Sequence, residues 1–80
     1  MKVLIEWTKA RGTDALRIEA DHATGAFLPV IDDTRPDHLD THARPAPGLA
    51  AVWKYRAIYV KNGEPVGSFS DVATVAVTGL

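Results

Sequence analysis

Residues 53–63 read WKYRAIYVKNG, and this stretch decides the fold. Its aromatic residues Trp53, Tyr55 and Tyr59 share one parity, as expected for a strand with one face in a core. Asn62-Gly63 follows directly and accepts the positive φ values of a two-residue type I′ turn. The stretch therefore predicts a β-hairpin whose three aromatic rings look inward.

The return strand of this hairpin is predicted to carry apolar residues on one parity, at Ala73, Val75 and Val77. Pro65 cannot donate to a ladder and Gly67 weakens a strand interior. The return strand is therefore expected at a sheet edge, with a bulge near Gly67.

Further strands are predicted by the same kind of pattern on the N-terminal side. Alternation of apolar residues indicates strands at residues 3–7 and 16–20, and an apolar run with Pro29 indicates an edge strand at 27–31. A short strand fits at residues 38–41. Because helical periodicity is missing, the sequence predicts an all-β, two-sheet antiparallel β-sandwich that forms a single domain over residues 1–80.

Composition excludes several classes of protein. The net charge of −1 with scattered basic residues offers no continuous cationic surface, so we expect no nucleic acid as partner. Cysteine is absent, which excludes disulfides and thiolate metal sites. Glu6 interrupts the apolar run 3–5, so we expect no signal peptide or membrane span in the chain as given, and its localisation is not indicated.

Several of these segments together resemble a fibronectin type III domain, in a short variant of the bacterial type. Trp7 resembles the core tryptophan of that family's second strand, Leu16-Arg17-Ile18 its third strand and residues 55–59 its sixth. Leu49 lies six residues before Tyr55, the spacing of the family's tyrosine corner. The resemblance implies an immunoglobulin-like sandwich in which the Tyr55 hydroxyl bonds back to backbone. The family's first strand is missing or shortened, which would leave a bare sheet edge.

The polar residues do not form a catalytic pattern. His38 and His42, with Asp37 and Asp40, could ligate a metal from one face of a helix, but Pro36 and Pro45 disfavour a helix there. We interpret the segment as a polar connector whose acids cap turns, with His22 as the remaining histidine. Neither serine lies in a nucleophile elbow. We therefore expect no enzyme, no metal and no cofactor; a metal-dependent hydrolase using His38 and His42 is a third hypothesis, which the absence of co-purified zinc would exclude.

The expected function is that of a non-catalytic protein-interaction or spacer module that associates with itself as a homodimer through an exposed strand edge or sheet face. The candidate interaction face combines charged residues with apolar residues expected to point out of the sandwich: Arg17, Glu19, Arg56, Ile58 and Val60. The alternative is a carbohydrate-binding accessory domain of a secreted or surface protein, with Trp7 and Trp53 as a stacking platform. For these tryptophans a buried structural role is the better interpretation.

Overall fold

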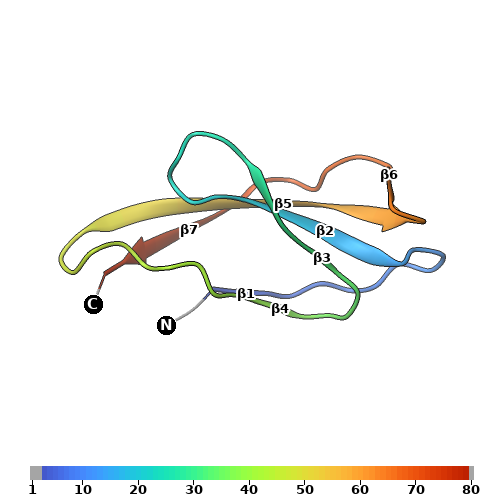
Figure 1. Ribbon diagram of the computed structural model, residues 1–80, viewed down its shortest axis with the longest axis horizontal. Helices are drawn as coiled ribbons and strands as arrows, with labels where there is room; N and C mark the ends of the chain where they lie inside the picture. Colours follow the sequence, from blue (N-terminus) through green and yellow to red (C-terminus); the bar gives the residue numbers. More distant parts are fainter. Residues whose placement is uncertain (1–2, 80) are drawn as a thin grey trace.

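The 12-residue strand β5 (Ala50–Lys61) is the strand on which the larger of two sheets is built. In the computed structural model, which describes residues 3–79, β2 (Ala15–Asp21) pairs antiparallel with the C-terminal part of β5, and β3 (Leu28–Asp33) covers the far edge of β2. The other edge of β5 is shared: β7 (Ala73–Thr78) pairs with its first half and β6 (Glu64–Val66) with its last residues. β5 thus runs the length of the molecule, whose longest dimension is 44 Å (Figure 1).

The hairpin predicted from Asn62-Gly63 is present. Both turn residues have positive φ, 52° and 79°, and Lys61 pairs with Glu64. The return strand lies at the sheet edge, as predicted, but it is divided into β6 and β7. Gly67 begins the interruption with a φ of 80°, and Ser70 then takes the place of a ladder residue, exchanging hydrogen bonds with the backbone of Ala57 at 2.7 and 3.0 Å.

The smaller sheet consists of two strands, β1 (Val3–Ile5) and β4 (His38–Asp40), which pair antiparallel with Leu4 opposite Leu39. It forms a second layer below the larger sheet in the view of Figure 1. The first strand predicted over 3–7 ends at Ile5, and the short strand near 38–41 is confirmed. Residues 3–79 form an all-β protein of two antiparallel sheets, with two and five strands and without a helix.

The core lies between the two layers. Leu16, Ile18 and Ala20 of β2 meet Trp53 and Tyr55 of β5, all of them buried. From the smaller sheet and the residue that follows it closely, half-buried apolar side chains pack against this cluster: Val3, Ile5 and Trp7. The predicted inward orientation of Trp53 and Tyr55 is confirmed, and the half-buried Tyr59 packs on the same cluster.

The described residues include no helix with the length and apolar character that crossing a membrane requires.

Candidate functional site

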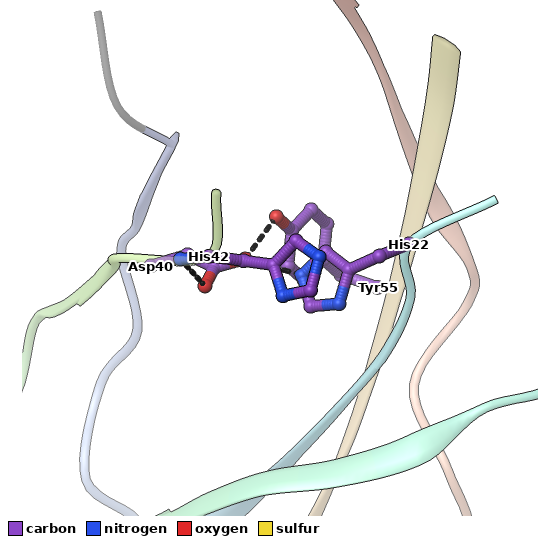
Figure 2. A network of polar contacts seen from close by, with 4 residues as sticks. All are labelled: His22, Asp40, His42 and Tyr55. Carbon is purple, nitrogen blue, oxygen red and sulfur yellow. Dashed lines mark hydrogen bonds and ion pairs between the residues drawn. The ribbon is translucent and has the colours of Figure 1, made fainter. Parts of the chain in front are cut away.

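A buried carboxylate, Asp40, is the centre of a polar cluster between the two sheets (Figure 2). It is the last residue of β4 and stands opposite Val3, so the alternation of the strand points it at the core rather than at solvent. Only 3% of Asp40 is exposed. One carboxylate oxygen, Oδ2, accepts a hydrogen bond from the Tyr55 hydroxyl at 2.5 Å and lies 2.8 Å from Nε2 of His22. The other, Oδ1, accepts from the backbone N–H of His42 at 3.0 Å.

Aromatic rings enclose this carboxylate. His22 follows β2 directly and His42 follows β4 closely, and their imidazole rings stack with centroids 3.7 Å apart and planes 3° apart. The indole of Trp53 meets both rings edge-on, at 4.6 and 5.2 Å between centroids. The cluster therefore joins the ends of β2 and β4 to the middle of β5, across both sheets.

The electrostatics of the cluster favour an ionised Asp40 and a protonated Tyr55. Burial is the largest influence on Asp40 and opposes ionisation, but the hydrogen bonds from His22, Tyr55 and the His42 backbone together outweigh it, so the pKa of Asp40 lies below its ordinary value. Burial, followed by the hydrogen bond to the Asp40 carboxylate, raises the pKa of Tyr55 well above its ordinary value. The carboxylate is thus ionised and the phenol protonated throughout the neutral range, which is the pairing that the short hydrogen bond needs.

This geometry is that of an internal tie, a polar contact that links the two sheets to each other. Both oxygens of Asp40 are used by donors within the protein, so no free carboxylate is presented to a substrate. Across residues 3–79 no group of three or more histidine, aspartate or glutamate side chains is arranged to hold a metal ion. His42 stacks on His22, whereas His38 lies in β4 opposite Ile5.

The interpretation of residues 32–48 as a connector with turn-capping acids is confirmed in one respect, because Asp40 caps the backbone N–H of His42. The sequence did not predict the second role of Asp40, which is to bind His22 and Tyr55 in the core. His22, Asp40 and Tyr55 are 15 or more residues apart, and only the folded topology brings them together. The available signal was parity, since Asp40 occupies an inward position in a short strand.

The Tyr55 hydroxyl was expected to bond back to backbone in a tyrosine corner. It bonds instead to the side chain of Asp40, and Leu49, the residue on which the spacing rested, is 60% exposed. A different tyrosine makes a backbone bond: the hydroxyl of Tyr59 donates to the carbonyl of Thr8 at 2.5 Å. The expectation for Tyr55 fails because the buried carboxylate lies within reach of its hydroxyl and is the stronger acceptor.

The charged members of the expected interaction face form pairs on the outer side of the larger sheet. Arg17 is bound to Asp32 at 2.8 Å, and Arg56 to Glu19 at 2.7 Å. The guanidinium of Arg56 also lies between two phenyl rings, 4.4 Å from the centroid of Phe27 and 4.2 Å from that of Phe69. These side chains are therefore engaged with one another within the chain.

Ile58 and Val60 were expected to be exposed on that face, and this is wrong. They do have the opposite parity to Tyr55, but only 6% and 3% of them are exposed. The register places Ile58 beside Arg17 of β2, and Val60 between Ala15 of β2 and Pro65 of β6, so neighbouring strands flank both positions. Whether the remaining charged residues contact a partner stays a prediction.

The two tryptophans do not share a surface. Trp53 is 4% exposed and belongs to the core, as the structural interpretation predicted. Trp7 is half-buried, and its indole N–H donates to Asp33 at 2.9 Å. The two rings therefore do not form a joint stacking platform, and carbohydrate binding stays a prediction.

Both edges of the smaller sheet are open within residues 3–79. Within the described residues β1 pairs only with β4, so its other edge carries unpaired backbone groups. On the outer side of the same sheet Leu4 and Leu39, 54% and 45% exposed, stand side by side. A groove of about 460 Å³ adjoins β1; its lining includes Ile5 and Trp7, Ser68 and Ser70, and edges of buried core side chains.

These features define a class, an all-β protein of two antiparallel sheets linked by a buried carboxylate, with the edge of β1 open. Comparison of the chain with protein-family models, with curated proteins and with solved structures found no match.

Proposed function

We propose that the chain is a non-catalytic interaction module of the fibronectin type III-like kind that associates with itself through the open edge of β1. The observation that carries this proposal is that edge, which is unpaired within residues 3–79 and bordered by the exposed Leu4–Leu39 pair. Unpaired N–H and C=O groups on a strand edge are a template for another strand. An exposed apolar pair beside them adds area that association removes from water.

Strand order supports the family assignment. In an immunoglobulin-like sandwich the second and fifth strands pair in one sheet, and the third, sixth and seventh form the other. β1 and β4 correspond to the second and fifth strands, and β2, β5 and the divided β6–β7 strand to the third, sixth and seventh. In this correspondence the free edge of β1 is where a first strand would pair.

The state of the polar residues supports a non-catalytic role. The buried carboxylate is satisfied on both oxygens, and Arg17 and Arg56 are paired with acids of their own sheet. None of these groups is held ready for a substrate. A module of this kind acts through its surface, and the edge of β1 is a surface with unused hydrogen-bonding capacity.

Sedimentation velocity over a range of concentrations tests the proposal, with two variants as a matched pair. Leu4→Lys places a charge on the edge strand, whereas Val52→Lys makes a comparable change at an equally exposed position of the larger sheet, 52% against 54%. We expect the wild-type chain to dimerise, Leu4→Lys to weaken the dimer and Val52→Lys to leave it unchanged. A monomer at high micromolar concentration, or equal effects of both variants, contradicts the proposal.

A further inference from the structure

We infer that the two copies pair β1 against β1 in antiparallel register, with Leu4 of one copy directly opposite Leu4 of the other. This inference rests on the proposed self-association and adds the arrangement of the partner. Two observations carry it: the symmetry of the sequence around Leu4 and the apolar groove that adjoins the free edge.

The sequence of residues 2–6, KVLIE, matches its own reverse in chemistry. When a second copy runs antiparallel and is centred on Leu4, Val3 stands opposite Ile5 of the second copy. Lys2 then stands opposite Glu6 of the second copy, and by symmetry Glu6 opposite Lys2. Lys2 lies outside the described residues, so its place in this pairing follows from sequence alone. Opposite charges directly across a strand pair are stabilising.

Other registers lose this match. A shift by one residue pairs the outward Leu4 with an inward residue and breaks the alternation of both strands. A shift by two residues keeps the alternation but places Glu6 or Lys2 opposite Leu4, without an ion pair. The centred register is therefore selected by charge and by the pleat together.

The groove explains why a second β1 is a suitable occupant of this edge. Residues directly opposite in a pair lie on the same face, so Val3 and Ile5 of the second copy face inward beside Val3 and Ile5 of the first. There they lie next to the groove that Ile5 and Trp7 line. Pairing covers the accessible parts of Leu4 and of the half-buried Val3 and Ile5.

Other open strands of the molecule are poorer candidates. β3 contains Pro29, which lacks the N–H that a ladder requires. On the small sheet, two antiparallel copies of β4 centred on Leu39 would place Asp37 opposite Thr41, without an ion pair, and the Asp40 carboxylate is buried and bound to Tyr55 and His22. Of β1, β3 and β4, β1 is the strand that the sequence flanks with opposite charges, Lys2 and Glu6.

Disulfide trapping tests the register directly, because the natural chain has no cysteine and an engineered thiol is the only one present. Directly opposite residues of an antiparallel pair have Cα atoms about 4.5 to 5.5 Å apart, within the range that a disulfide spans. Leu4→Cys should therefore oxidise to a covalent dimer. Leu39→Cys is the matched control, similarly exposed and adjacent on β4, but about 14 Å from its copy across three strand spacings. It should stay uncross-linked.

Charge exchange provides a second, independent readout. Lys2→Glu and Glu6→Lys should each raise the dimer dissociation constant by roughly 2- to 30-fold, since symmetry removes two cross-strand ion pairs. The double variant Lys2→Glu/Glu6→Lys restores the pairs and should restore the wild-type constant. Lys54→Glu, an exposed exchange on the larger sheet, controls for net charge.

The outcomes separate this inference from the proposal beneath it. A dimer in which Leu4→Cys cross-links and the double charge variant is rescued supports both. A dimer in which Leu39→Cys cross-links and Leu4→Cys does not overturns the register and leaves self-association standing. A chain that remains monomeric overturns both.

Discussion

The two sheets of this molecule are stabilised by different means. In the larger sheet, β2 and β5 bury apolar side chains such as Ile18 and Trp53 along a continuous antiparallel ladder. In the smaller sheet, the only buried residue of β1 and β4 is the carboxylate of Asp40; the apolar side chains there are half-buried or exposed. The larger sheet is therefore held by hydrophobic packing, and the smaller one depends on polar contacts to its neighbour.

Four hydrogen bonds connect the smaller layer to the larger. Tyr55 and His22 bind Asp40, the indole of Trp7 binds Asp33 at the end of β3, and Tyr59 binds the carbonyl of Thr8. The bonds are distributed over three acceptors: Asp40 of β4, Asp33 of β3 and the carbonyl of Thr8. A two-stranded layer can thus be fixed on a sheet by a few directional contacts, while its outer edge stays free for a partner.

The largest effect is expected from Tyr55→Ala, which removes a buried ring from the large sheet and a donor from Asp40 at the same time. It should lower the free energy of unfolding by about 3 to 5 kcal/mol, as large-to-small core changes do. Urea denaturation followed by tryptophan fluorescence measures it. Lys54→Ala, the exposed neighbour on the same strand, should change little; similar losses at both positions would contradict the assignment of faces.

Asp40→Asn separates the polar tie from the packing, since it keeps the size of the side chain and removes its charge. It should cost about 2 to 3 kcal/mol, because a buried donor from Tyr55 or His22 loses its partner. Chemical denaturation at neutral pH provides the value. A loss below about 0.5 kcal/mol would mean that the smaller sheet does not depend on this contact.

The difference in stability between the wild type and Asp40→Asn should depend on pH. Because the pKa of Asp40 is lowered in the folded state, its ionised form stabilises the fold above the ordinary carboxyl pKa of 3.8, and this stabilisation is lost as the pH falls through the folded-state pKa. Asp21 and Asp32, whose pKa values are also lowered by hydrogen bonds from the Thr24 backbone and from Arg17, titrate in both proteins. The stability difference between wild type and Asp40→Asn should therefore shrink in acid. A difference that is constant from neutral pH to acid would contradict it.

Gly63→Ala acts on the larger sheet alone. The turn holds this residue at a φ of 79°, where a Cβ costs about 1 to 2 kcal/mol, although open space surrounds the position. Thermal unfolding should show the loss. Because the hairpin is far from Asp40, the cost should add to that of Asp40→Asn in the double variant; strong coupling would show that the two sheets are not stabilised separately.

The smallest effect is expected for Trp7→Phe, which keeps an aromatic ring beside Tyr59 and removes the indole N–H that binds Asp33. We expect a loss of about 0.5 to 1.5 kcal/mol, typical of one net hydrogen bond. Denaturation curves of the single variant and of Trp7→Phe/Asp33→Ala should nearly coincide. If Asp33→Ala adds a full further loss, the hydrogen bond is not what Trp7 contributes.

Much of this fold is predictable from the sequence because its signals are local. Alternation at 16–20 and 53–59 and the Asn62-Gly63 turn set strands, hairpin and inward faces, and Pro29 marks an edge. The return strand is divided at Gly67 and Ser70. The sequence indicated an irregularity at Gly67 and gave no sign of the role of Ser70.

The candidate site could not be predicted in the same way. The tie at Asp40 requires three residues from separate strands or their ends, and a local pattern does not report which strands become neighbours across a core. The prediction that Ile58 and Val60 are exposed failed for a related reason. Their burial depends on their neighbours in the flanking strands, which are Arg17, Ala15 and Pro65. Parity tells which face a side chain takes, and only the register tells what covers that face.

Native-state hydrogen exchange in wild type and Tyr55→Phe tests most directly whether polar contacts hold the smaller sheet. The variant keeps the core ring and removes one donor to Asp40. We predict that backbone amides of β1 and β4 exchange through a lower opening free energy than those of β2 and β5, and that Tyr55→Phe lowers it further for β1 and β4 before global unfolding. Equal protection of all four strands in the wild type, with a uniform change in the variant, would contradict the account.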